Sequence, residues 1–479
     1  MKKNNISSIA ILLFSMLMFI VSCTNVLEIE PVSQYGANFL STKTGVNAVL
    51  NSAYANGQFI QDEGVNRIYV EESTTDVFVN FRGFLNGNLQ YIMDYSWGTS
   101  HTYLVNFWNN NYRAIRDANI VLEAVPDHPG LTTAEKNQFE GEARFIRGTA
   151  YSFLYGWYGP VPIVKSSTDD KFPAKASEDE IKAFIINDLT KASELLSTKS
   201  SQIGRATKGS ALGVLAEFYN NTKQWTLAAS TAKQVMDLGL YKLWPDFTTL
   251  FALANEGNSE MIYVFPAIAV EPYGNVWVAN ALPPLYNTPI MNTATQVCMP
   301  VQFYNTFTTG DHRKDLILAN YTDKNGKLVD LTTGVEYQNP RSLKYPLDPN
   351  AQNRSGGADF PIIRYADVLL IRAEGLVMSS GTVSSEALSL LNQIRNRAGL
   401  ASLTSADLPD KNTFITQLLK ERSWEFYSEG KRREDLIRHD LLIQNALARG
   451  KNAKAYQVRF PIPQSDIDAN KNLIQNEGY

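Results

Sequence analysis

The sequence predicts a mainly α-helical protein in which a tetratricopeptide-like helical repeat scaffold carries a large, loop-rich irregular lobe. Two zones, at about residues 44–240 and 361–479, place apolar residues at helical spacing. Between them, about residues 244–360 are rich in proline and contain the pair Gly356-Gly357, which excludes long helices there. No long linker interrupts these zones, so we expect one domain over residues 44–479.

The first 22 residues have the pattern of an export signal. Lys2 and Lys3 precede the apolar run 9–21, which is shorter than the about 20 residues that a membrane span requires. Residues 20–23 resemble a lipobox, so we expect cleavage before Cys23, lipidation of Cys23 and a tether over residues 23–43. An uncleaved anchor and a soluble secreted protein are the alternatives.

Helix boundaries can be placed from the sequence in the first zone. Pro126 is expected to end a helix that contains Trp108, and Gly159-Pro160 to end the next one, which runs over residues 145–158. Residues 177–180 match a capping box, in which a serine side chain and a glutamate satisfy free amides at a helix start.

Two segments have the alternation of small and large residues that is typical of a tetratricopeptide helix pair. Ala216 and Ala228 are the small residues of the first copy, and Ala373 and Ala387 those of the second. Because Ala216 and Ala373 are 157 residues apart, the sequence predicts a helical repeat that is interrupted by insertions.

Composition and motifs argue against several classes of function. The formal net charge of −4, from which a cleaved leader would remove two lysines, lacks the basic excess that nucleic-acid binding requires. The four histidines have no second His or Cys at ligand spacing, so we expect no metal and no cofactor. Glu71, Glu72 and Asp76 are neighbours in sequence, which gives no glycosidase geometry, so we predict a protein that is not an enzyme.

Aromatic residues make up 11% of the chain, and two clusters of rings are candidates for stacking on sugar rings. Trp97 stands outside a clear helical period and is expected to be an exposed platform, whereas Trp108 is expected in the core. For each of these rings, burial in the core is the alternative. The candidate ligand-binding residues are Asp76, Arg82, Tyr95 and Trp97 in or beside the first cluster and Tyr273, Trp277 and Tyr286 in the second.

Motifs spread over the chain resemble the SusD/RagB family of Bacteroidetes nutrient-uptake lipoproteins. The most specific is Arg-Tyr-Ala-Asp-Val-Leu-Leu-Ile-Arg-Ala-Glu at residues 364–374, and Arg433-Glu434 departs from the family by replacing a usual aromatic pair. The other matching segments are residues 27–31, 141–147, 158–162, 390–399, 421–426, 429–438 and 460–463.

The resemblance implies an outer-membrane lipoprotein at the cell surface that captures a glycan or another oligomer without catalysis. It also implies a partner, a SusC-like TonB-dependent transporter to which the ligand is delivered. A helical-repeat lipoprotein that binds peptides or proteins and a surface glycoside hydrolase are the alternatives. Six charged residues of the family motifs are expected to form ion pairs that orient the repeats, namely Arg364, Asp367, Arg372, Glu374, Arg422 and Glu425.

Overall fold

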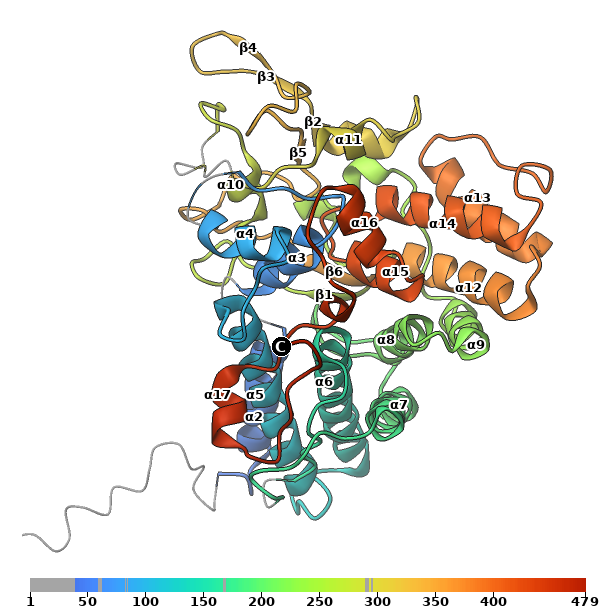
Figure 1. Cartoon of the computed structure of the whole chain (residues 1–479). Coiled ribbons are helices and arrows are strands. Elements are labelled where there is room, and N and C mark those ends of the chain that lie inside the picture. Colours follow the sequence, from blue (N-terminus) through green and yellow to red (C-terminus); the bar gives the residue numbers. More distant parts are fainter. Residues whose placement is uncertain are drawn as a thin grey trace, which may run out of the picture.

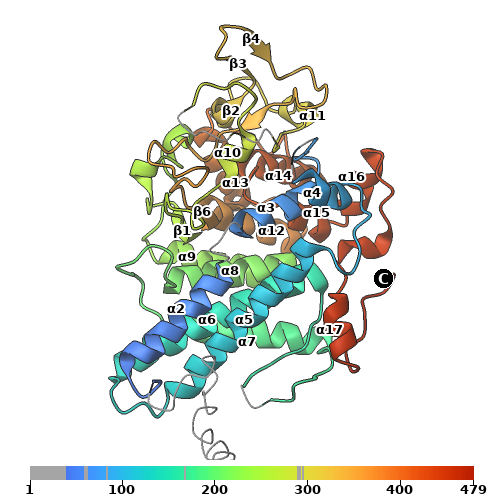
Figure 2. The same cartoon turned by 90° about the vertical axis from the view of Figure 1, so that its left-hand side faces the viewer.

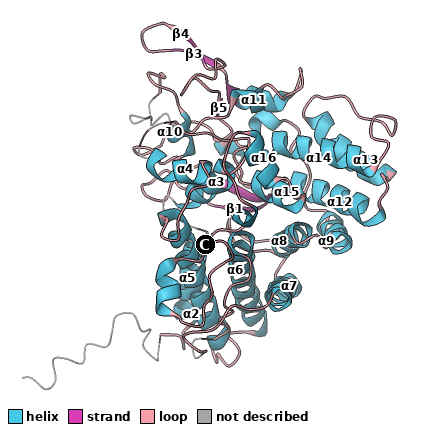
Figure 3. Ribbon diagram, viewed as in Figure 1, coloured by secondary structure: helices cyan, strands magenta, loops and turns pink. Residues whose placement is uncertain are grey.

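Helices dominate the computed structural model, which describes residues 39–58, 63–81, 83, 85–166, 169–288, 293 and 296–479 (Figure 3). This confirms the predicted fold class, helical with a loop-rich lobe. Cys23 and Arg82 lie outside the described residues. Seven long helices of the described part build the repeat scaffold: α2 (Lys43–Gly57), α5 (Thr102–Ala124), α6 (Thr133–Tyr158), α7 (Glu178–Leu195), α8 (Lys208–Asn221), α9 (Trp225–Asp237) and α12 (Tyr365–Ser380), followed by α13 (Ser385–Arg397).

Local sequence signals set the ends of these helices. Helix α7 begins with the predicted capping box, in which the Ser177 side chain accepts from the Glu180 amide and the Glu180 carboxylate accepts from the Ser177 amide. Helix α6 ends where predicted, at Gly159, whose φ of 74° is unfavourable for other residues. A Cβ atom at Gly159 would lie 2.5 Å from the guanidinium carbon of Arg459, so the close packing of Arg459 also requires a residue without a side chain here.

The two repeat copies, distant in sequence, are neighbours in the structure. Helix α9 packs against α12, so the pairs α8/α9 and α12/α13 form one continuous array (Figure 1). Ala216, Ala228 and Ala373 are fully buried at the helix contacts. A Cβ atom on Gly375 would lie 2.7 Å from the Trp225 carbonyl oxygen, which shows how closely α12 approaches α9.

The insertion between the copies begins and ends on a two-stranded antiparallel sheet. Strand β1 (Met261–Phe265) pairs with β6 (Phe360–Arg364), and Phe265 lies opposite Phe360. Beyond this base the chain forms loops and short elements at the upper end of the molecule (Figure 2). These are α10 (Trp277–Ala281), α11 (Val301–Tyr304), β2 (Ile317–Leu318), β3 (Asn320–Thr322), β4 (Leu328–Asp330) and β5 (Arg341–Ser342).

The C-terminal segment returns from the array to the first helices. Trp108 on α5 is buried, as predicted, and its Nε1 donates to Asp466 Oδ1 at 3.0 Å. No helix in the described part of the chain combines the length and the apolar character needed to cross a membrane. The remaining helices are α3 (Glu63–Ser73), α4 (Asn86–Met93), α14 (Lys411–Glu425), α15 (Arg432–Arg438), α16 (Leu442–Ala448) and α17 (Gln464–Ala469).

The charged residues of the family motifs form ion pairs, and most of these pairs are fully buried. Arg364 pairs with Glu260, Glu425 and Glu429, and all four side chains are at most 1% exposed. The pairs Arg422–Asp367 and Arg438–Glu374 are buried as well, whereas Arg372 pairs with Glu386, which is 45% exposed. The predicted ion pairs are therefore confirmed. Most of them are buried between helices and do not lie on a helix surface.

Candidate functional site

A cleft forms where an early segment of the chain meets the lobe. After α3 the chain becomes extended, and Val79 forms an isolated antiparallel bridge with Cys298, with both N–H···O distances at 3.0 Å. This bridge joins two segments that are more than 200 residues apart. It places the first predicted ring cluster beside the loop lobe, and an ion pair between Asp94 and Lys451 joins the end of α4 to the segment after α16.

The cleft has a volume of about 640 Å³, within the roughly 300–1,000 Å³ that is usual for ligand pockets. Phe81 is 47% exposed at the cleft and presents an aromatic face, while Phe303 from α11 is buried in its wall. Gln302 is exposed and adds an amide group that can bond hydroxyls, whereas Asn80 is buried in the wall and the Gln90 amide nitrogen donates to Asp94. The other lining residues are Thr75, Asp76, Phe78, Val79, Met93, Pro300, Thr306, Ala448, Arg449 and Lys451.

Ion pairs fix the charged groups around the cleft. Arg432 donates to both carboxylate oxygens of Asp76, at 2.8 and 2.9 Å. Burial alone would raise the pKa of Asp76, but the charge of Arg432 and the hydrogen bonds to the carboxylate together hold the pKa below its ordinary value. At the rim, Lys451 Nζ lies 2.7 Å from Asp94 Oδ1.

Two of the predicted ligand-binding rings lie behind the cleft rather than in it. Trp97 is only 5% exposed, so the prediction of an exposed platform is wrong. Its ring packs against Tyr95 and Phe460, and its Nε1 donates to Tyr479 Oη at 2.8 Å. Tyr95 is 4% exposed and donates to the Thr74 carbonyl at 2.6 Å, beneath the cleft wall.

The rings of the second cluster do not line the cleft either. Trp277 is 1% exposed and packs against Phe78 and Tyr69, so it supports the wall from behind. Tyr273 is 42% exposed in a turn of the lobe, and Tyr286 is half-buried against Tyr321. Of the seven predicted ligand-binding residues, the structure places Asp76 in the cleft lining, and Arg82 lies outside the described residues.

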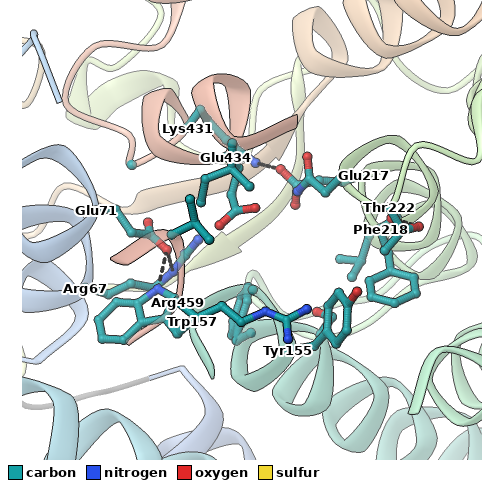
Figure 4. Close-up of a pocket in the computed structure, with 18 residues that line it drawn as sticks. Arg67, Glu71, Tyr155, Trp157, Glu217, Phe218, Thr222, Lys431, Glu434 and Arg459 are labelled. Carbon is teal, nitrogen blue, oxygen red and sulfur yellow. Dashed lines mark hydrogen bonds and ion pairs between the residues drawn. The ribbon is translucent and has the colours of Figure 1, made fainter. Parts of the chain in front are cut away.

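A second cavity, of about 220 Å³, lies between α3, α6, α8 and α15 (Figure 4). Lys431 and Glu434 lie on one side of it, opposite Tyr155 and Trp157. Most charged groups of its wall pair with each other, as in Lys431–Glu217 and Arg67–Glu71, and burial raises the pKa of Glu434 to about 7. Its volume is below the usual range for ligand pockets, so the larger cleft is the better candidate.

Sequence reasoning missed the C-terminal wall of the cleft. Arg449 and Lys451 follow a short helix and have no motif or periodicity that separates them from other surface cations. Asn80 and Gln302 likewise carry no local signal. Phe81 was not among the predicted ligand-binding residues, although it stands in a segment rich in Gly and Asn, which favours exposure of a ring.

Comparisons with known proteins agree with this architecture. A sequence model described as "SusD family" matches residues 255–479, and one described as "Starch-binding associating with outer membrane" matches residues 26–220. SusD-like protein P2 of Formosa agariphila is 27% identical, with both chains covered completely. The starch-binding protein SusD of Bacteroides thetaiotaomicron is 23% identical over 96% of each chain. A solved laminarin-binding SusD-like protein superposes with a TM-score of 0.80 at 22% identity, over 91% of this chain and all of the other.

Proposed function

Because the chain belongs to the SusD/RagB family, we propose that it is a cell-surface lipoprotein that binds a glycan in the cleft. Related proteins are described as binding starch and laminarin, which are both glycans. The cleft suits such a ligand, since Phe81 offers a face for a sugar ring and the exposed Gln302 offers a donor and an acceptor for its hydroxyls. The exposed Phe81 ring is the observation that carries the proposal.

The proposal also covers the cellular location of the protein and its partner. A lipid on Cys23 anchors the protein to the outer membrane, and the bound glycan passes to a SusC-like TonB-dependent transporter. This part of the proposal is supported by the export signal and by the lipobox-like residues 20–23. It is also supported by the match of residues 26–220 to proteins described as associating with the outer membrane.

Binding without bond cleavage fits the carboxylates of the cleft. Glycoside hydrolysis uses two carboxyl groups about 5–9.5 Å apart. Among the described residues that line the cleft, Asp76 is the single carboxylate, and both of its oxygens accept from Arg432. A glycoside hydrolase would need a second carboxyl group in this cleft, and its first carboxyl group could not be held by an arginine through both oxygens.

The test replaces the exposed ring. We expect Phe81→Ala to weaken binding of the recognised glycan about tenfold, because ring stacking and apolar burial together contribute on the order of 1–2 kcal/mol. Tyr91→Ala is the matched control, since Tyr91 is 55% exposed on α4 but does not line the cleft. Isothermal titration calorimetry against a panel of neutral and acidic oligosaccharides measures both, and thermal melting confirms that both variants fold.

If Phe81→Ala and the wild-type protein bound the glycan with equal affinity, the proposal that the cleft is the binding site would be wrong. Failure of the wild-type protein to bind any glycan of the panel would refute the proposed function itself.

A further inference from the structure

Among the described residues in or beside the cleft wall, cations outnumber carboxylates by one. Three cations lie in or beside its wall, Arg432, Arg449 and Lys451, against two carboxylates, Asp76 and Asp94. Asp76 is bound by Arg432 through both oxygens, and Asp94 is bound by Lys451. The described residues therefore leave the guanidinium of Arg449 without a carboxylate of its own.

In the part of the chain that the structure describes, the hydrogen bonds of Arg449 go to neutral groups. Its Nη2 donates to the Thr74 carbonyl at 2.7 Å and its Nε donates to Asn445 Oδ1 at 3.0 Å. The hydroxyl of Tyr95 also lies beside it and is neutral, because burial raises the pKa of Tyr95. Within the described part of the chain, no carboxylate forms an ion pair with Arg449, although the charge of Asp76, which binds Arg432, acts on it and partly offsets the lowering of its pKa by burial.

This arrangement differs from that of three arginines in the core. Arg364, Arg422 and Arg438 are all buried, and each is bound by at least two carboxylate oxygens. Arg449 is half-buried, and burial lowers the pKa of its guanidinium below the ordinary value. Arg449 has lost part of its water, and the carboxylate whose charge acts on it, Asp76, is already bound by Arg432 through both oxygens. An anion arriving at the cleft would therefore be stabilised there.

Resting on the proposed function, we propose that the glycan of this cleft is acidic, carrying a carboxylate or a sulfate group that pairs with Arg449. A guanidinium presents donors in a planar fork that matches both anions, and such charge-assisted hydrogen bonds are about twice as strong as neutral ones. Phe81 then contacts the face of a sugar ring in the same cleft, and the amide of Gln302 bonds its hydroxyls. Lys451, which is 29% exposed at the rim, adds to the local positive potential.

Three oligosaccharides of similar length test the proposal by calorimetry on the full mature chain: neutral laminarihexaose, a hexamer of galacturonic acid and a sulfated galactan hexamer. We expect at least one of the acidic chains to bind tenfold or more tightly than the neutral one, with an affinity that falls as salt is raised. Preference for the galacturonate identifies a carboxylate as the recognised group, and preference for the galactan identifies a sulfate.

Variants tie the preference to one side chain. Arg449→Gln should lower the affinity for the acidic chain about tenfold and leave any neutral binding within twofold, whereas Arg449→Lys should restore part of the loss. Arg113→Gln, at an exposed arginine of α5 outside the cleft, is the control and should change nothing. Thermal melting accompanies each variant, and the lysine variant keeps the test valid if the glutamine variant folds poorly.

Two results overturn the inference, and they are distinguishable. If laminarihexaose binds as tightly as the acidic chains and Arg449→Gln alters both equally, the ligand is neutral and the proposed function stands. If none of the three chains binds, the inference fails together with the proposed function.

Discussion

Trp97 shows how tertiary contacts decide the role of a single ring. Its local sequence, next to Gly98 and Thr99, indicates exposure. The structure instead places the ring 4.9 Å from that of Phe460, in an edge-on contact, with its indole nitrogen bonded to Tyr479. Both partners are more than 360 residues away in sequence, so no local pattern could reveal them. Trp277 is buried for the same reason, by Tyr69 and Ser342.

Trp97→Ala should therefore affect stability and leave affinity intact. Truncating a fully packed tryptophan costs roughly 3–5 kcal/mol in the free energy of unfolding, through lost burial and the cavity left behind. Tyr273→Ala, at a ring that is 42% exposed, should change the same quantity by less than about 0.5 kcal/mol. Urea denaturation measures both variants. If the Trp97→Ala protein had normal stability but bound glycan poorly, Trp97 would be a ligand-binding residue and not a core residue.

At the scale of elements, local signals fix the helices and long-range pairing fixes the lobe. The cap of α7 and the end of α6 follow from residues that are adjacent in sequence, and both were predictable. The sheet β1/β6 could not be predicted, because its strands are about a hundred residues apart and carry no turn that joins them. Helices α10 and α11 have five and four residues, too few to show a period.

The close contact between α9 and α12 depends on Gly375, which has no side chain. We expect Gly375→Ala to lower the free energy of unfolding by about 1–3 kcal/mol, because its Cβ would lie 2.7 Å from the Trp225 carbonyl and force the two helices apart. Gly87→Ala in α4 is the control, since no atom lies within 4 Å of the added carbon. It should leave stability unchanged or raise it by up to about 1 kcal/mol, as alanine favours helix. Chemical denaturation that ranks the two variants in the opposite order would contradict this packing.

At the scale of the whole molecule, buried charges join the parts that the sequence separates. Arg364 stands where β6 meets α12, Glu260 precedes β1 at the base of the lobe, and Glu425 and Glu429 come from the C-terminal segment. Burial alone would raise the pKa of Glu425, but Arg397, Arg364 and Arg313 lower it to about 2. The family motifs predicted that these residues pair, but the identity of the partners required the fold.

Removing Arg364 should consequently weaken the junction of all three parts. Arg364→Met keeps an unbranched side chain of similar length but leaves three buried carboxylates short of one cation, and such a broken pair costs roughly 3–5 kcal/mol. Arg372→Met is the matched control, because the partner of Arg372 is 45% exposed and an exposed pair contributes about 0–1 kcal/mol. Denaturant unfolding at pH 7 measures both, and hydrogen exchange locates the loss. We expect faster exchange in β1, β6 and α14 of Arg364→Met, whereas an equal effect of the two variants would show that the buried cluster contributes no more than a surface pair.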